Sequence, residues 1–155
     1  MRTGPHCTYG IAALLCLTAV GTRQGWAAPP RFVQLNSARG DVRKQLGKNP
    51  LWRPAKVGDK LKGSDQLRTG KNSTAVLRLD GADSSLISVA PNTLLRITTL
   101  VTAKTGGRQS RFLVSRGGVT SKVRGLLNRE STLEVRTPAC MGGVRGTELA
   151  VTASA

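Results

Sequence analysis

The chain has 155 residues, with 24 lysines and arginines against 8 aspartates and glutamates, and a formal net charge of +16. This length suits one domain with a real core, and the charge predicts an acidic partner: nucleic acid, anionic lipid or a charged polysaccharide. Nucleic acid is disfavoured, because only 3% of the residues are aromatic and single-strand binders stack bases on aromatic rings. The basic residues are scattered, which also fits a well-solvated surface.

The N-terminal segment has the order of a secretory signal peptide. Arg2 precedes an uncharged, largely apolar run at residues 11–20, and the small residues Gly25 and Ala27 follow. The run is well short of the roughly 20 residues that span a bilayer. A buried helix of the mature fold is the alternative. We predict a signal peptide over residues 1–27, an exported protein that is periplasmic or extracellular, and no membrane span in the mature chain.

Removal of this segment would leave little catalytic chemistry. The single histidine, His6, would be lost with Cys7 and Cys16, so Cys140 would be the one remaining cysteine. A lipoprotein signal at Cys16 is disfavoured by the bulky Leu15 before it. Without histidine there is no Ser-His-Asp triad and no histidine metal site, and one cysteine forms no intramolecular disulfide. We therefore expect no enzyme activity, cofactor or metal.

The mature chain shows the pattern of an all-β protein. Residues 28–39 form a linker and an entry strand in which Val33 and Leu35 face the core. From residue 40, apolar positions alternate with period two between turn signals every 8–12 residues, and no helical period is sustained. We predict one β domain over residues 40–155 with roughly ten short strands, either a sandwich or a short β-solenoid-like stack. Turns are expected at residues 105–108 and at Gly117 and Gly118.

Two features of the loops leave alternatives open. Trp52 lies in a loop between Pro50 and Pro54, where it either plugs one end of the core or stacks on a sugar. Asp59, Asp65 and Asp80 each adjoin a glycine or a turn residue, where a short carboxylate bonds to local backbone. We favour turn roles for these three aspartates over a glycosidase pair or a calcium site.

Residues 137–151 contain a rigid turn at Pro138, three glycines and then an alternating strand. No lysine or helix follows the glycines, so they do not form a phosphate-binding loop. We expect them to form a corner that locks the last strand. Cys140 is either a small filler in the turn or an exposed thiol, and Arg145 either holds the backbone or reaches an acidic ligand.

An ordered set of motifs resembles FecR-type domains from about Gly40 to Val151. The stretches that carry the resemblance are residues 57–61, 65–75, 77–81, 91–93, 135–139 and 143–149. We expect structural roles for its signature positions, which are Gly58, Asp59, Asp65, Arg68, Thr69, Gly70, Ser73, Asp80, Gly81, Pro91, Asn92, Thr137, Pro138, Gly143, Arg145, Gly146 and Thr147.

The resemblance implies an envelope-exposed β domain. In the namesake family this domain is the periplasmic sensor of an iron-siderophore signalling protein, which also has a sigma-factor-regulating segment and a membrane helix. Here only a signal-like segment precedes the domain. Cys140 and Met141 stand where the family has small residues, and the chain stops at Ala155 where the family continues, so we expect a last strand without a partner and a C-terminal truncation.

Two functions are compatible with these observations. The first is a non-enzymatic exported module that binds a protein or an acidic envelope polymer through a basic β-surface. The second is a periplasmic sensor in FecR-like iron-transport or sigma-factor signalling that acts with a separate membrane partner. The ligand and the oligomeric state stay open.

Overall fold

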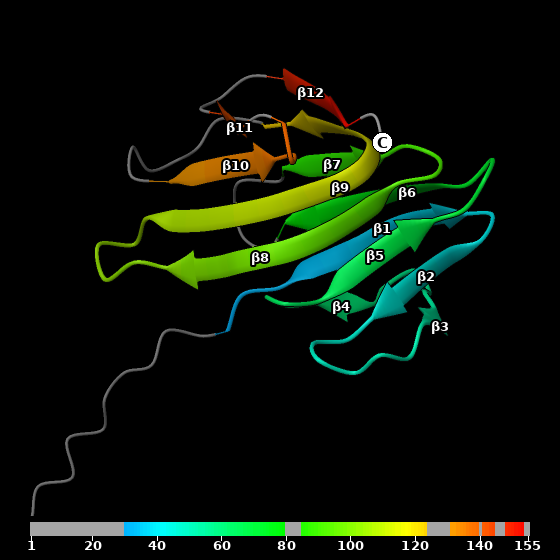
Figure 1. The fold of residues 1–155 in the computed structure, drawn as a ribbon. Helices are drawn as coiled ribbons and strands as arrows, with labels where there is room; N and C mark the ends of the chain where they lie inside the picture. Colours follow the sequence, from blue (N-terminus) through cyan, green and yellow to red (C-terminus); the bar gives the residue numbers. More distant parts are fainter. Residues whose placement is uncertain (1–29, 80–84, 124–130, 140, 145–147, 154–155) are drawn as a thin grey trace, which may run out of the picture.

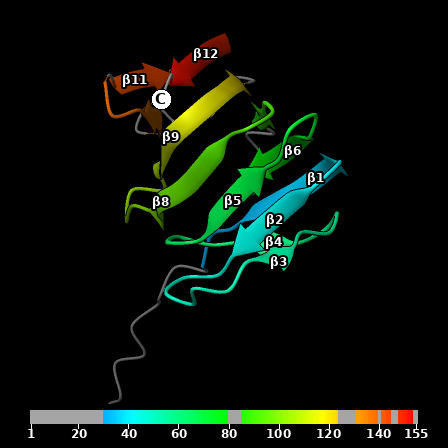
Figure 2. The same cartoon turned by 45° about the vertical axis from the view of Figure 1, so that its right-hand side comes forward.

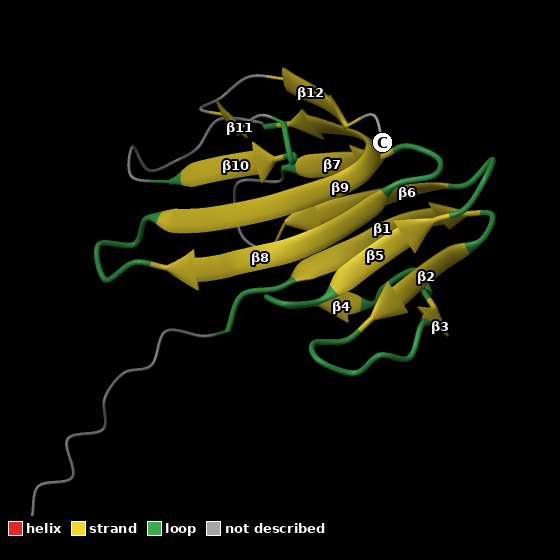
Figure 3. Ribbon diagram, in the orientation of Figure 1, coloured by secondary structure: helices red, strands yellow, loops and turns green. Residues whose placement is uncertain are grey.

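In the computed structural model, all regular structure is β-strand within the described residues, which are 30–79, 85–123, 131–139, 141–144 and 148–153 (Figures 1 and 3). The all-β prediction is confirmed, with 12 strands in these residues. The strands are β1 (Val33–Arg39), β2 (Val42–Gln45), β3 (Arg53–Pro54), β4 (Lys60–Leu61), β5 (Gln66–Thr69), β6 (Thr74–Leu79), β7 (Leu86–Val89), β8 (Leu94–Thr102), β9 (Arg108–Lys122), β10 (Thr132–Arg136), β11 (Met141–Val144) and β12 (Glu148–Ala153).

The strands form one curled sheet in the order β3-β2-β5-β8-β9-β7-β6-β1-β4. The pairing of β9 with β10 is parallel and the other pairs are antiparallel. Residues 108–116 of β9 pair with β8, whereas residues 117–122 pair with β7 and β12. The strand β9 therefore joins two halves. The front half contains β3, β2, β5, β8, β10 and β11, and the back half contains β4, β1, β6, β7 and β12 (Figures 1 and 2).

One hydrophobic core lies between the two halves. Alternate residues of β5, β6, β7 and the first half of β8 are buried, such as Leu67 and Leu95 of the front half and Leu77 and Ile87 of the back half. All four belong to the same cluster, so the halves pack face to face. Val33 and Leu35 are buried as predicted. The fold therefore combines the facing layers of a sandwich with the repeated crossings of a stack.

The structure corrects the predicted turn at Gly117 and Gly118. β9 continues through both glycines as one strand of 15 residues. Gly117 has φ +88, a conformation that L side chains rarely adopt, and the pairing with β8 shifts register between Leu94 and Leu95. The glycine and the bulge bend β9 from the front half into the back half, and no hairpin forms.

The glycines after Pro138 are also placed differently from the prediction. Gly142 and Gly143 lie in β11, opposite Val135 and Glu134 of β10, so they form part of a hairpin rather than a corner. Glycine is tolerated at these two positions because the backbone of β11 is paired with the backbone of β10, and this pairing requires no side chain. The last strand, β12, is not without a partner, since it pairs with β9 at six positions. The predictions for Cys140 and Arg145 lie outside the described residues.

Candidate functional site

Four chain crossings between the halves stack into one corner. They lie at residues 40–41, 70–73, 90–93 and 116–118, and backbone bonds connect them. The amide of Gly70 donates to the carbonyl of Asp41 at 2.8 Å, and the amide of Asn92 donates to the carbonyl of Gly70 at 3.1 Å. The Ser73 hydroxyl accepts from the Asp41 amide at 2.8 Å. Signature residues that are separate in the sequence thus meet at one edge of the fold.

Two buried threonines complete this corner. The Thr69 hydroxyl donates to the carbonyl of Ala90 at 2.6 Å and accepts from the Thr93 amide at 3.0 Å. The Thr93 hydroxyl accepts from the Gly118 amide at 3.1 Å. Asn72 and Asn92 have φ 60 and φ 53, a conformation that asparagine tolerates in turns. The side chains of this corner bond to backbone, which is a structural arrangement.

Asp65 lies at the opposite ends of the front strands and is 6% exposed. One carboxylate oxygen accepts from the Gly47 amide at 2.7 Å and the other accepts from the Lys62 amide at 2.7 Å. The amide of Ser64 donates to the carbonyl of Ile97 at 2.7 Å. Asp65 therefore ties two loops to the ends of β5 and β8.

Asp59 occupies the turn before β4. Its carboxylate accepts from the Lys56 amide at 2.7 Å and lies 2.6 Å from Nζ of Lys44. Partial burial opposes ionisation, but the hydrogen bonds from Lys44 and Lys56 and their positive charges outweigh it and hold the pKa of Asp59 below its usual value. Next to it, Gly58 has φ +93 and its amide donates to the carbonyl of Leu35 at 2.7 Å.

Of the remaining signature positions, Thr137 is buried and Pro138 is exposed beyond the end of β10. Asp80, Gly81, Arg145, Gly146 and Thr147 lie outside the described residues.

Arg68 differs from the other signature residues, because it lies on the outer face of the front half. Two rows of side chains cross this face at right angles to the strands. In the first row, Arg43, Arg68, Leu94 and Arg116 lie opposite one another on β2, β5, β8 and β9. The second row crosses the same four strands and consists of Gln45, Gln66, Arg96 and Leu113. We call this surface the arginine face, and it also includes Arg111, Glu134 and Arg136.

The arginine face has more positive charge than its carboxylates balance. Glu134 bonds to both Arg111 and Arg136, at 3.0 and 3.2 Å. The side chains of Arg96 and Arg116 are exposed, and their guanidinium groups make no hydrogen bond or ion pair with another described residue. Arginine carries five donors in a planar fork that matches carboxylates and phosphates. The two exposed arginines are therefore available to an acidic ligand.

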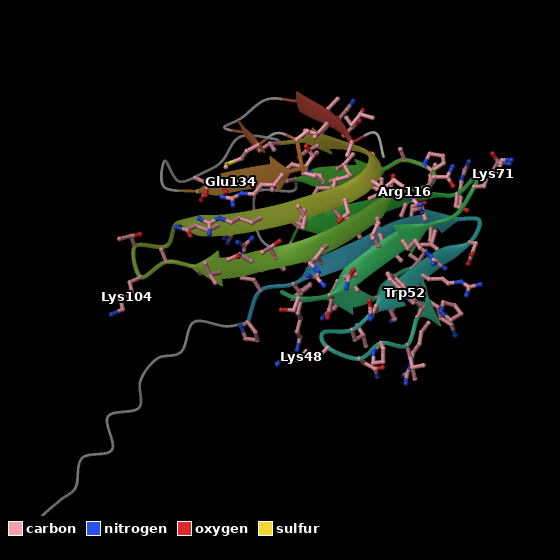
Figure 4. All side chains as sticks on the ribbon, in the orientation of Figure 1. Lys48, Trp52, Lys71, Lys104, Arg116 and Glu134 are labelled. Atoms are coloured by element: carbon pink, nitrogen blue, oxygen red, sulfur yellow. The ribbon has the colours of Figure 1, made fainter. Side chains whose placement is uncertain are left out.

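Trp52 contributes the aromatic ring of this face, where Figure 4 shows it over β2 and β5. It is half-buried and does not belong to the core cluster, which corrects the predicted core plug. The physical reason is that Pro54 holds the loop as an edge strand against β2, with Arg43 as its partner. The guanidinium of Arg68 lies 5.1 Å from the centre of the Trp52 ring, a cation–π distance.

A groove of about 460 Å³ lies at one end of the arginine face. It is lined by Gln45, Gly47, Lys48, Ser64, Gln66, Arg96, Ile97 and Thr98. Amides, hydroxyls and two cations dominate this lining, and it contains no carboxylate. The groove can donate and accept hydrogen bonds and attract an anion.

Two other kinds of site are absent from the part of the chain that the structure describes. No three histidine, cysteine, aspartate or glutamate side chains there come together to hold a metal ion. None of these residues forms a helix that is long and apolar enough to cross a membrane.

The fold and the face together define a β domain with stacked corners and a basic outer surface. The family model described as FecR protein matches residues 65–155, which is more than half of the chain. The chain belongs to the FecR family, as its motifs predicted. This is a family of sensors and signalling proteins that acts through protein interactions, and it is not an enzyme family. No curated protein and no solved structure matches the chain.

Sequence reasoning identified Arg68 but missed Gln45, Gln66 and Arg96. Each lies an odd number of positions from a buried residue of its strand, which is Val42 for Gln45, so the alternation places it outside. The alignment of the three into one row depends on the register between strands that are up to 51 residues apart in sequence, from Gln45 to Arg96. That register cannot be predicted from the sequence of any single strand.

Proposed function

We propose that the protein is an exported, non-enzymatic FecR-type module that binds an acidic partner in the cell envelope through the arginine face. The observation that carries the proposal is the imbalance of charge on this face. The arginines of this face are Arg43, Arg68, Arg96, Arg111, Arg116 and Arg136. Within the described residues of the front strands, Glu134 is the one carboxylate.

The absence of catalysis is part of this proposal. Asp59 and Asp65 use their oxygens to hold backbone amides or Lys44, which supports turn roles for both. A carboxylate engaged in this way is a poor general base, because its lone pairs are already occupied. A hydrolysis assay on envelope polysaccharides with the purified protein tests this point, and product formation would contradict it.

Export is proposed from the signal-like segment at residues 1–27. A fusion of this segment to a reporter enzyme that is active only outside the cytoplasm tests it. We expect activity from the fusion and none from the same reporter without the segment. Equal activity from both would contradict export.

Binding is tested by capture from envelope extract on the immobilised protein at low and at high salt. Exposed arginines attract a polyanion or an acidic protein through charge, and salt screens that attraction. We expect a partner that is retained at low salt and released at high salt. A matched column with Arg68→Ala and Arg96→Ala should retain less. Equal retention on both columns would move the binding surface away from the arginine face.

Family membership favours a second candidate, a periplasmic sensor in iron-transport or sigma-factor signalling that acts with a separate membrane partner. A sigma-factor or transporter gene beside this gene would support it. Deletion of this gene should then change the transcription of that neighbour. Unchanged transcription would favour the binding module alone.

A further inference from the structure

We propose that the groove beside Arg96 binds an acidic polysaccharide, a chain of sugars that carry carboxylates. The proposal rests on the proposed function, because it names the class of acidic partner that this face recognises. The lining of the groove combines cationic side chains with amides and hydroxyls.

The second row supplies groups that suit both parts of such a ligand. Gln45, Gln66 and Arg96 lie directly opposite one another on β2, β5 and β8. Glutamine both donates and accepts hydrogen bonds, as a sugar hydroxyl requires, whereas arginine only donates and matches a carboxylate. Neighbouring strands lie about 4.8 Å apart, so this row repeats its polar groups at roughly the length of one sugar ring.

The walls of the groove are fixed before a ligand arrives. Asp65 accepts hydrogen bonds from the amides of Gly47 and Lys62, at 2.7 Å in both cases, and thereby ties the two adjoining loops. The Ser64 amide donates to the carbonyl of Ile97, and both residues belong to the lining. A preformed polar groove lowers the entropy that binding costs. Asp65 is therefore a positioning residue, since its own oxygens are occupied.

The same lining disfavours a folded protein as the ligand of this groove. The energetic centres of protein interfaces are aromatic or aliphatic anchors in desolvated pockets. Ile97 is the one apolar side chain of the lining, and it is 1% exposed. The groove therefore offers hydrogen bonds along a path and no pocket for an anchor.

The first row extends the path toward the corner. The guanidinium of Arg68 lies over the Trp52 ring and covers one face of that ring. This arrangement leaves the N–H edge of the guanidinium for a ligand. Arg116 is exposed at the corner end of the face (Figure 4). A chain that enters at Lys48 would meet Gln45, Gln66 and Arg96 of the second row and then Arg68 and Arg116 of the first row.

Three polymers distinguish the contribution of the sugar hydroxyls from that of the carboxylates. Polygalacturonate carries hydroxyls and carboxylates, its methyl ester keeps the hydroxyls without the charge, and polyglutamate carries carboxylates without the hydroxyls. Isothermal titration of the purified protein at moderate salt should give the tightest binding for polygalacturonate, by about 10-fold over each of the other two. Tighter binding of polyglutamate would overturn the proposal and favour an acidic protein segment.

Variants locate the site. Arg96→Ala and Gln66→Ala should each weaken polygalacturonate binding about 10-fold. Arg78→Ala is the matched control, because Arg78 is an exposed arginine on the outer face of the back half. Equal losses from Arg96→Ala and Arg78→Ala would show that the protein binds acidic polymers through its charge in general, and would refute this groove as the site. If single-stranded DNA binds as tightly as polygalacturonate, the claim that the groove recognises a sugar chain is refuted. If none of the polyanions binds even at low salt, the proposed function fails as well.

Discussion

The hydroxyl of Thr93 and the backbone of Gly118 form a two-way contact between residues that lie 25 positions apart. The Gly118 amide donates to the Thr93 hydroxyl at 3.1 Å, and this hydroxyl lies 3.2 Å from the Gly118 carbonyl. Thr93 is fully buried, so water cannot replace these bonds. The contact joins the β7–β8 crossing to the bend of β9.

Thr93→Val tests this contact. Valine has nearly the same shape but no hydroxyl, which removes the buried acceptor of the Gly118 amide. We expect the free energy of unfolding to fall by about 2 kcal/mol, measured by urea denaturation. Thr74→Val is the control, because Thr74 is exposed on β6, and its effect should be within about 0.5 kcal/mol. Equal effects in the two variants would contradict a structural role for the corner.

The bend of β9 requires glycine at position 117. A Cβ there would clash with the Thr93 hydroxyl and lie 2.6 Å from the Thr93 Cα, and φ is +88. Gly117→Ala should therefore lower stability by about 3 kcal/mol, from backbone strain and overpacking together. Gly58→Ala separates the two causes, because Gly58 has φ +93 with nothing within 4 Å, and about 1 kcal/mol is expected. If Gly58→Ala costs as much, the close approach to Thr93 is unimportant.

Asp65 should matter for both stability and the groove. Asp65→Asn keeps one acceptor and turns an amide donor toward a backbone N–H, so we expect a loss of about 2 kcal/mol in thermal or urea denaturation. Asp41→Asn is the matched change at a carboxylate that is 57% exposed and paired with Arg43. Exposed pairs contribute little, so its effect should stay below about 1 kcal/mol. A small effect at position 65 would show that the loops do not depend on this carboxylate.

The Asp59–Lys44 pair predicts a dependence of stability on pH. The folded-state pKa of Asp59 is lowered, so its contribution is fully present above the unfolded pKa and is lost as the pH falls through the folded value. Stability should therefore drop below about pH 4. Lys44→Met removes the partner and should flatten this part of the profile. An unchanged acid slope in the variant would show that other carboxylates dominate.

Two buried serines offer opposite expectations. The Ser121 hydroxyl is buried without a hydrogen-bond partner among the described residues, whereas the Ser110 hydroxyl lies 3.2 Å from Nη1 of the buried Arg31. Ser121→Ala should leave stability unchanged or raise it by up to about 1 kcal/mol, and Ser110→Ala should lower it by about 1–2 kcal/mol. Calorimetry of both variants checks the ranking, which a destabilised Ser121→Ala would reverse.

Much of the fold could be predicted, because period-two alternation is a local property. Ala75, Leu77 and Leu79 are buried on one face of β6 as the alternation predicts. The bend of β9 could not, because a glycine pair permits both a hairpin and a bent strand. The choice depends on Thr93, which lies more than 20 residues away and contacts Gly117 only in the folded chain.

The candidate site was predicted only in its basic character. Arg68 was identified from a motif, but its stacking on Trp52 and its place in a row with Arg43 follow from the pairing of β2 with β5. Net charge predicts that an acidic partner is attracted and does not say to which face. Only the register of the strands gathers Arg43, Arg68, Arg96 and Arg116 on one face.

An NMR titration of the isotope-labelled protein with polygalacturonate tests the central claim that the arginine face is the binding surface. We predict that amide shifts change on β2, β5 and β8, around Gln45, Gln66 and Arg96, with little change on β6 and β7. Shifts that concentrate on the back half around Arg78 and Ser88, or shifts spread evenly over the surface, would contradict the claim.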